Sequence, residues 1–570
     1  MERWVEIRKG GDFTTLGKKL GVHPIIARII RNRGMADEAQ MKEYLYGTTL
    51  HAPELLTDLE KAANILEEKI RTGKKIRIIG DYDIDGVSAT YILLEGFKTL
   101  GGTVDTVIPH RIKDGYGVND SLMKQAIEDG IDTVVTCDNG IAAIDTIALG
   151  KEAGLTIVVT DHHEMPYTEK NGKKEYQFSA ADAIVDPKRP DDTYPCKGIC
   201  GAVVAWKLVE YLYRQFGLPR EASDVFLENA AFATVGDVMD LIGENRTIVK
   251  LGLKRIANTK NPGLSALIAA NELNKEEIKA YQIGFVLGPC INASGRLESA
   301  KRSLQLLCAK TAEEADKEAK ELVALNESRK QMTAQGVEQA DQLIAREGLD
   351  KDLVMVVFLP ECHESLAGII AGRIREKYKK PVFVLTRADG GEVKGSGRSV
   401  EGYSMYDEMT KCSDLFTKFG GHPMAAGLSM KEEDIPSLRK RLNEQTDLTE
   451  EKLIPVVKID AVMPLQYLSL QFAEELSVLE PLGKGNEKPN FAAKDVPVSY
   501  ERICGEHRNV VRMQLRTENG GSLTGVWFGD GDAFVEDLKK RNHTLSILYY
   551  PTVNEYRDTK SLQVMIHAYL

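Results

Sequence analysis

Short apolar runs alternate with helix-like stretches over residues 50–310 of the 570-residue chain, as in a doubly wound parallel sheet. Three of these runs are typical of buried strands and extend from Ile76 to Ile79, from Asp132 to Cys137 and from Leu155 to Thr160. A helix-like run from Val87 to Leu100 follows the first of them. The pattern therefore predicts an α/β domain over residues 50–310.

A helical period dominates the next segment, residues 311–350. Apolar positions such as Ala315, Leu322 and Leu325 recur at near-helical intervals between Thr311 and Gly348, and no proline interrupts them. We expect one long helix here, and a helix of this length would connect two domains that face each other.

Strand and helix signals return in residues 351–451. The pattern predicts a buried strand from Leu353 to Leu359, a helix from Ser365 to Tyr378 and a further strand from Pro381 to Leu385. Beyond Lys452, short alternating segments are separated by turn-like glycines and polar residues, which indicates a small β-barrel of the oligonucleotide-binding (OB) type. The expected barrel segments are Val456 to Ile459, Val496 to Glu501, Val510 to Leu515, Leu523 to Phe528, Leu545 to Tyr550 and Ser561 to Ala568.

Composition adds a few limits to this picture. An apolar content of 43% supports a globular chain of two to four domains. No run of about 18 uninterrupted apolar residues exists, and MERWVEIRKGG lacks the apolar core of a signal peptide, so we expect a cytosolic protein without a membrane segment.

Among eight scattered cysteines, only Cys196 and Cys200 are close, and one such pair does not complete a zinc site. A net charge of −11 does not exclude nucleic acid, because local basic clusters such as Arg373 to Arg398 decide phosphate contact.

Acidic and imidazole side chains gather directly after the three apolar runs. The blocks are GDYDIDG (Gly80 to Gly86), TCDNG (Thr136 to Gly140) and VTDHHE (Val159 to Glu164). Parallel strands deliver their carboxyl ends to one edge of an open sheet, so these side chains should converge. Close carboxylates repel one another and partly protonate unless a cation offsets them. The pattern predicts a two-metal site for phosphoester hydrolysis, and carboxylates with imidazole suit manganese or magnesium.

A plainer interpretation exists for each position taken alone. An Asp at a strand end is more often a helix cap or a turn residue than a ligand, and Asp85 before Gly86 fits that role. Three such clusters after three consecutive strands are much harder to explain as caps. The joint pattern therefore favours the metal site.

The three blocks resemble the first signature motifs of the DHH phosphoesterases, and Gly236-Asp237 resembles the fourth. Further motifs resemble the RecJ branch of that family, over roughly residues 50–570: NASGR (Asn292 to Arg296), HESLAGIIAGRI (His363 to Ile374), GSGRS (Gly395 to Ser399) and FGGHPMAAG (Phe419 to Gly427). The implied fold has two α/β domains joined by a long helix, with an OB-type β-barrel at the C-terminal end. The expected parts are an N-terminal segment (1–49), a DHH domain with a parallel sheet (50–310), the connecting helix (311–350), a DHH-associated substrate-binding domain (351–451) and the barrel (452–570).

The resemblance also implies roles for individual residues. Two divalent cations, Mn²⁺ or Mg²⁺, would be held by Asp83, Asp85, Asp138, His162 and Asp237. Asp81 and His163 are expected beside the cations and share a catalytic role with Asp138, with His163 at the scissile phosphate. Substrate-binding positions implied in the same way are Arg111, Arg296, Arg373, Ser396, Arg398 and His422.

The function implied by the resemblance is a metal-dependent, single-stranded-DNA-specific exonuclease that works from the 5′ end in DNA recombination and repair. Single-strand-binding protein and a RecQ-type helicase are the suggested protein partners, and a monomer is our default expectation. Two alternatives remain open. Other DHH proteins hydrolyse pyrophosphate, short oligonucleotides or cyclic dinucleotides, and a replication scaffold could keep the fold and bind single strands without cutting. The C-terminal barrel and the length of the chain favour a polymeric substrate over the first alternative, and competent residues at every motif position favour a nuclease over the scaffold.

Overall fold

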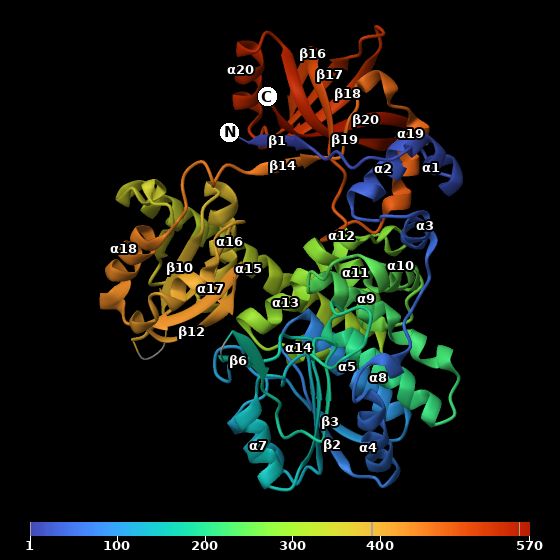
Figure 1. The fold of residues 1–570 in the computed structure, drawn as a ribbon, viewed down its shortest axis with the longest axis vertical. Coiled ribbons are helices and arrows are strands. Elements are labelled where there is room, and N and C mark those ends of the chain that lie inside the picture. The colour runs from blue at the N-terminus through green and yellow to red at the C-terminus, as the bar shows by residue number, and fades with distance from the viewer. Residues whose placement is uncertain (1, 171, 389–390, 558) are drawn as a thin grey trace. The chain divides into compact units, whose positions relative to one another are not determined.

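The computed structural model describes residues 2–170, 172–388, 391–557 and 559–570, and the chain divides into two compact units. The α/β unit comprises residues 51–237 and 251–455, and the barrel unit comprises residues 2–50, 238–250 and 456–570. Figure 1 shows the fold with its elements labelled. Each unit has its own layers and core, and the predicted metal ligands all belong to the α/β unit.

A five-stranded parallel sheet forms the first part of the α/β unit, in the order β3-β2-β4-β5-β8. Its strands are β2 (Lys75–Ile79), β3 (Thr103–Val107), β4 (Thr133–Cys137), β5 (Thr156–Thr160) and β8 (Ala183–Val185). The chain passes from β2 to β3 on one side and then returns to β4 on the other side of β2. The strand order therefore reverses between β2 and β4, and a ligand crevice is expected outside the carboxyl ends of these two strands.

Helices cover both faces of this sheet, as expected for parallel strands whose central members are buried on both sides. Figure 1 shows α4 (Leu59–Arg71) and α7 (Ile144–Glu152) on opposite faces. The helix α6 (Asp120–Glu128) packs with α7 on one apolar core, and α5 (Ile84–Thr99) packs with α8 (Gly201–Gln215) on the other side. Every residue of β4 is buried, so the sheet is a rigid base for whatever its strand ends carry.

A helical layer continues the α/β unit up to the connecting helix. One uninterrupted helix runs through α12 (Ala280–Gln282), a π-helical turn (Ile283–Leu287) and α13 (Gly288–Leu297). The connecting helix α15 (Ala312–Glu347) begins with a capping box between Thr311 and Glu314 and ends at Gly348, which confirms the predicted long helix. The other helices of this region are α9 (Leu227–Gly236), α11 (Pro262–Ala270) and α14 (Lys301–Cys308), and α10 (Gly243–Ile256) begins in the barrel unit and ends in the α/β unit.

The second part of the α/β unit is a mixed sheet in the order β12-β13-β11-β10-β9. Only β9 and β10 are parallel, and the remaining pairs are antiparallel. The elements are β9 (Met355–Phe358), α16 (Ala367–Tyr378), β10 (Val382–Arg387), β11 (Val393–Arg398), α17 (Met405–Thr410), β12 (Phe416–His422), β13 (Ala425–Met430) and α18 (Ile435–Gln445). The predicted strand, helix and strand of residues 353–385 are all present, with ends shifted by one or two residues.

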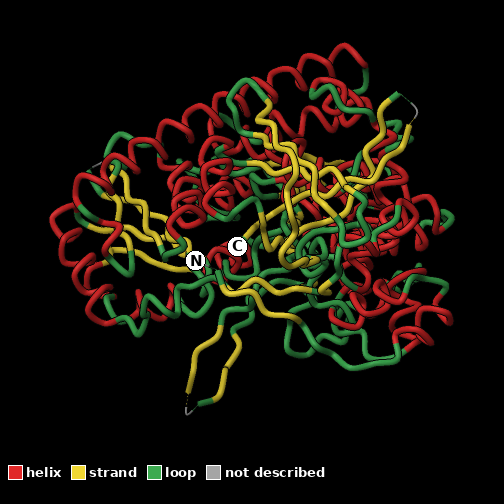
Figure 2. Tube along the Cα trace, turned by 90° about the horizontal axis from the view of Figure 1, so that it is seen from above, coloured by secondary structure: helices red, strands yellow, loops and turns green. Residues whose placement is uncertain are grey.

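A two-stranded hairpin of β6 (Tyr167–Lys170) and β7 (Lys173–Tyr176) leaves the first sheet shortly after β5. All eight of its strand residues are exposed, and Figure 2 shows it projecting from the body of the unit. The sequence pattern did not predict this hairpin.

The barrel unit closes because β16 pairs with β17 on one side and with β19 on the other. The order β16-β17-β18-β20-β19 thus returns to its first strand, as in an OB-type barrel. Its strands are β16 (Phe491–Cys504), β17 (Val510–Arg516), β18 (Ser522–Phe528), β19 (Thr544–Tyr556) and β20 (Thr559–Tyr569), with α20 (Gly531–Lys540) between β18 and β19. The short β15 (Ala461–Val462) adds to β16, and α19 (Leu470–Glu475) precedes the barrel.

Residues from the start of the chain complete the barrel unit. The helices α1 (Phe13–Leu20), α2 (Pro24–Asn32) and α3 (Glu38–Tyr46) share one apolar core with the barrel strands. Val456–Ile459 forms β14, which pairs in parallel with β1 (Arg3–Glu6). The expectation that this segment is a barrel strand is therefore wrong, because its partner is the N-terminal strand in a separate two-stranded sheet. The long helix and the closed barrel confirm the predicted fold class.

Candidate metal centre and phosphate groove

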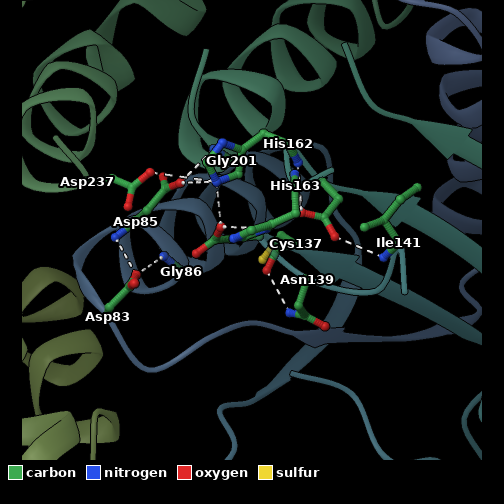
Figure 3. Close-up of polar contacts among 12 residues, drawn as sticks. Asp83, Asp85, Gly86, Cys137, Asn139, Ile141, His162, His163, Gly201 and Asp237 are labelled. Carbon is green, nitrogen blue, oxygen red and sulfur yellow. Dashed lines mark hydrogen bonds and ion pairs between the residues drawn. The ribbon is translucent and has the colours of Figure 1, made fainter. Parts of the chain in front are cut away.

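The predicted metal ligands meet at the carboxyl ends of β2, β4 and β5 and at the end of α9. Asp81 follows β2, and the Asp83 side chain caps α5 by accepting from the backbone N–H groups of Asp85 and Gly86, at 2.9 and 3.1 Å. Asp138 follows β4, His162 follows β5, and Asp237 is the C-cap residue of α9. Figure 3 shows side chains from all four segments close together. The convergence expected from parallel strands is thus observed.

His162 lies at the centre of one group of ligands. Its Nε2 is 3.1 Å from Asp138 Oδ1, 3.4 Å from Asp85 Oδ2 and 3.7 Å from Asp237 Oδ2. Three overlapping groups have ligand atoms within 4.8 Å of one another: Asp85 with His162 and Asp237, Asp81 with Asp83 and Asp138, and Asp138 with His162 and His163. Asp138 and His162 each belong to two of these groups, and of the two only the carboxylate of Asp138 offers two oxygens with which to bridge a pair of cations.

Backbone and side-chain contacts hold Asp138 and Asp85 in these positions. Asp138 has a φ of 59°, in the left-handed region, and the next residue, Asn139, donates from Nδ2 to the carbonyl oxygens of Ile79 and Cys137. Asp85 accepts the backbone N–H of Gly201 and of Ala202, both at 2.7 Å, at the start of α8. The positive end of that helix favours a charged carboxylate at this point.

Gly201 is a functional position that the sequence analysis missed. A Cβ at this residue would lie 2.7 Å from the Cβ of Asp138 and 3.1 Å from Asp85 Oδ2. Only glycine lets the α8 N-terminus approach both ligands. The signal in the sequence was a single glycine at the start of a helix, which alone does not distinguish close approach from an ordinary turn.

The site carries more negative charge than burial tolerates. Burial, followed by neighbouring carboxylates, raises the pKa of Asp81 and of Asp138 well above the usual range. Burial, followed by Asp85 and Asp83, raises the pKa of Asp237 to about 8. Burial also lowers the pKa of His162, which keeps its imidazole neutral and able to bind a metal. A divalent cation would offset these charges.

The side chain of Asp81 supports this interpretation. Both of its carboxylate oxygens are buried without a hydrogen-bond partner. Buried polar atoms are almost always satisfied, so unpaired ones mark a place where a ligand is expected. Oxygen and imidazole donors in buried, overlapping groups fit Mn²⁺ or Mg²⁺.

His163 differs from His162 in its surroundings. Its Nδ1 lies 2.8 Å from Asp161 Oδ1, and the hydroxyl of Tyr116 lies 3.2 Å from its Nε2. Burial opposes protonation, but the hydrogen bond and charge of Asp161 outweigh it and raise the pKa of His163 to about 9. Tyr116 also donates to the carbonyl oxygen of Asp138, at 3.0 Å. The sequence analysis did not identify Tyr116, whose only signal was its place in a glycine-rich loop.

A groove of about 480 Å³ lies between the two parts of the α/β unit. Four of the six predicted substrate-binding residues line it, namely Arg111, Arg296, Ser396 and Arg398. Gly368 lines it as well, and a Cβ there would lie 2.8 Å from Arg398 Nη2. The absence of a side chain at Gly368 on α16 thus makes room for Arg398 in the groove.

The arginines of this groove lack acidic partners among the residues that the structure describes. Arg111 lies over the ring of Tyr82 with its Cζ 3.8 Å from the centroid, Arg296 donates to the carbonyl oxygen of Ser365 at 2.8 Å, and Arg398 donates to the carbonyl oxygen of Gly397. Burial, followed by the charges of Arg111, Arg329 and Arg398, lowers the pKa of Arg296 to about 10. Gathered arginines without counter-ions indicate an anionic ligand.

Two predicted substrate-binding residues lie outside the groove lining. Arg373 is exposed on α16 and pairs with Glu376 at 3.3 Å. His422 is exposed at the end of β12, opposite Ala425. Their roles remain predictions.

The barrel aromatics divide into two classes. Trp527 stacks on Phe534 with ring centroids 4.7 Å apart, and Tyr550 is buried, so both serve core packing. Tyr500, Phe528 and Tyr556 are exposed.

Comparison with known proteins agrees with this geometry. Residues 75–234 match the DHH family N-terminal domain, residues 351–447 match the DHHA1 domain and residues 459–568 match the RecJ OB domain. The single-stranded-DNA-specific exonuclease RecJ of Bacillus subtilis is 34% identical over 99% of this chain and 70% of its own length.

Two solved structures of RecJ from Thermus thermophilus also match. The complex with Mn²⁺ has a TM-score of 0.83 and 27% identity, covering 100% of this chain and 79% of that one. The complex with Mg²⁺ has a TM-score of 0.77 and 28% identity, covering 100% and 78%.

The parallel sheet with acidic clusters at its switch point, followed by a second α/β domain, is the architecture of a DHH phosphoesterase. With matches that cover nearly all of this chain, the chain belongs to the RecJ family of single-stranded-DNA-specific exonucleases. The resemblance stated from the motifs is confirmed. Among the described residues, no helix combines the length and apolar character needed to cross a membrane.

Proposed function

We propose that this protein is a metal-dependent exonuclease that hydrolyses phosphodiester bonds of single-stranded DNA from the 5′ end and acts in DNA recombination and repair. The observation that carries the proposal is the pairing of two features in one unit: overlapping carboxylate and histidine groups, and a groove whose arginines have no acidic partner among the described residues. Two cations, Mn²⁺ or Mg²⁺, would activate water and stabilise charge on the phosphate oxygens when bound.

The ligands divide naturally between two positions. Asp85, His162 and Asp237 would hold one cation, Asp81 and Asp83 would hold the other, and Asp138 would bridge them. Asp81 is thereby a ligand rather than a neighbour, because both of its oxygens are otherwise unsatisfied.

His163 would act on the scissile phosphate directly. Its Asp161 partner holds the ring in place and keeps it protonated, so the imidazolium can donate a hydrogen bond to a phosphate oxygen. The hydroxyl of Tyr116 donates to the carbonyl oxygen of Asp138 and lies 3.2 Å from Nε2, so a bound phosphate oxygen would replace Tyr116 as the acceptor of the Nε2 proton.

Polarity and strand preference would follow from the groove. Arg111, Arg296, Ser396 and Arg398 would hold the phosphates at the 5′ end, so that the next bond reaches the cations from one direction. Arg373 and His422 are proposed to touch the strand farther out. A duplex end presents no free strand to such a groove.

The setting of the activity is part of the proposal. The eight cysteines, all of which the structure describes, form no disulfide, as expected in a reducing compartment, and we propose the cytoplasm as the place of action. Single-strand-binding protein and a RecQ-type helicase are proposed partners that deliver substrate, and the working unit is proposed to be a monomer.

Degradation of labelled single strands tests this function. We expect a strand labelled at its 5′ end to lose its label as mononucleotide at once with Mn²⁺, while a 3′-labelled strand shortens stepwise. A chelator should stop both reactions, and a blunt duplex should resist. Release of label first from the 3′ end would contradict the proposed polarity, and binding without cleavage would indicate a scaffold.

A further inference from the structure

Two exposed aromatic rings stack on each other on the helix that leads into the phosphate groove. Tyr281 is 64% exposed and Phe285 is 70% exposed, and their ring centroids lie 4.9 Å apart with an interplanar angle of 29°. They are four residues apart, which places them on one helix face. Large rings with this much exposure need a reason, since burial of either ring elsewhere would be favourable.

The helix that carries them lies against the metal centre. A Cβ on Gly284 would lie 3.7 Å from Val235, two residues before Asp237, and a Cβ on Gly288 would lie 3.2 Å from Ile84, between Asp83 and Asp85. Asn292 on the same helix accepts the backbone N–H of Ile84 at 2.8 Å. The helix therefore borders two of the ligand segments along its length.

The two ends of this helix have different chemistry. Arg296, in its last turn, lines the phosphate groove and donates to the carbonyl oxygen of Ser365. The stacked rings are in its first turns. Arg296 lies eleven positions after Phe285, which corresponds to roughly 16 Å of helix, or about five nucleotides at a stacked spacing of about 3.4 Å.

A π-helical turn sets the rings apart from the regular helix. The turn covers Ile283–Leu287 and ends two positions before Pro289, which has no N–H to donate to the preceding turn. Such turns occur preferentially at functional sites. Here the turn contains Phe285 itself.

We propose that Tyr281 and Phe285 form a base-stacking platform for the part of the single strand that lies on the 3′ side of the cleavage site. The 5′ phosphates lie at Arg296 and Arg398, the scissile bond lies at the cations, and the following bases leave along the helix and stack on the two rings. Aromatic faces accept any base, so the platform adds affinity without sequence preference. The proposal rests on the proposed function, because it assumes that the strand enters from the 5′ end.

Binding of single strands in chelator, where no hydrolysis occurs, tests the platform in the full chain. The probes are 5′-phosphorylated dT3 and dT12. We expect the double variant Tyr281→Ala with Phe285→Ala to bind dT12 about 10- to 100-fold more weakly than the parent. The preference of the parent for dT12 over dT3 should largely disappear in this variant.

Matched variants distinguish ring stacking from a merely apolar contact. Tyr281→Phe with Phe285→Tyr keeps both rings and should bind dT12 as the parent does. Tyr281→Leu with Phe285→Leu keeps an apolar surface without rings and should lose most of the affinity. Full affinity in the leucine variant would overturn the proposal, since it would show that an apolar surface without rings is enough to bind dT12. Phe178→Ala removes a different exposed ring and should change nothing.

Photo-crosslinking locates the platform along the strand. Strands with 5-iodouracil at one position should crosslink to Tyr281 or Phe285 when the label is among about the third to sixth nucleotides from the 5′ end. Crosslinks to these rings only from the 3′ terminus, or none from any position, would overturn the platform. Neither result would affect the exonuclease assignment, which depends on the cleavage of labelled strands.

Discussion

The Oδ1 atom of Asp161 lies 2.8 Å from the Nδ1 atom of His163, while the adjacent His162 points its Nε2 at the carboxylates of the metal centre. Two neighbouring imidazoles thus have opposite tasks. Burial lowers the pKa of His162 and keeps it neutral as a ligand, and Asp161 overcomes burial to raise the pKa of His163 to about 9. The hydrogen bond and the charge of Asp161 thus distinguish His163 from His162.

Replacement of Asp161 by Asn should separate these roles. Histidine NMR of the metal-free chain should show one imidazole that titrates near pH 9 in the parent and titrates at least about one pH unit lower in Asp161→Asn, because the raising charge is gone. His163→Gln identifies the resonance by removing it. A high-pKa imidazole that persists in Asp161→Asn would contradict the assigned cause.

Asp138→Ala should abolish hydrolysis while leaving the fold intact. We expect kcat to fall at least about 10²- to 10³-fold, because the bridging carboxylate is lost. The Tm in chelator should stay equal or rise, since a buried like charge disappears. Mn²⁺ should raise the Tm of the parent and raise that of the variant much less. Unchanged turnover would refute the ligand assignment.

The arginines of the second α/β domain should differ in importance. Arg398 is half-buried in the groove without an acidic partner among the described residues, whereas Arg373 is exposed and paired with Glu376. We expect Arg398→Gln to weaken binding of a 5′-phosphorylated strand about 10- to 100-fold. Arg373→Gln should cost no more than about fivefold. Filter binding at several salt concentrations measures both, and equal losses would contradict the placement of the phosphates.

Glu228 on α9 should make stability depend on pH. Burial raises its pKa from 4.5 to about 7, although its Oε1 accepts the hydroxyl of Thr259 at 2.9 Å. Between pH 4.5 and about 7, Glu228 is therefore protonated in the folded chain and ionised in the unfolded chain. Since the unfolded chain binds fewer protons in this range, the free energy of unfolding falls as the pH rises through it.

Glu228→Gln removes this titration and keeps the acceptor for Thr259. We expect the variant to be more stable than the parent at pH 8 by on the order of 2–3 kcal/mol, and by much less at pH 5. Thermal unfolding at the two pH values in chelator measures the difference. A variant that is destabilised equally at both pH values would show that the charge of Glu228 does not cause the pH dependence of stability.

Much of the catalytic site could be predicted from sequence because of local rules. Asp81, Asp138 and His162 follow buried parallel strands, and parallel strands must present their ends at one edge. Asp237 has no such rule, since it follows a helix, and only the family motif indicated it. Tyr116 reaches the site from a loop, and Gly201 reaches it from the start of α8. Neither position belongs to a periodic hydrophobic pattern, so the sequence did not predict their place in the site.

The barrel unit contains contacts between distant parts of the chain that local sequence patterns do not predict. The guanidinium of Arg246 is buried and donates to the carbonyl oxygens of Tyr44, Leu479 and Pro481. These partners lie more than 200 positions away along the chain in either direction. Contacts of this kind join residues 2–50 and 238–250 to residues 456–570, and the sequence alone treated the first segment as separate.

Anomalous diffraction from crystals grown with Mn²⁺ tests the central claim most directly. We expect two peaks about 3.5–4 Å apart, one among Asp85, His162 and Asp237, the other between Asp81 and Asp83, with Asp138 touching both. Crystals of the Asp138→Ala variant should lose at least one peak. A single peak elsewhere, or ligand side chains that bind no manganese at saturating concentration, would contradict a two-metal nuclease site.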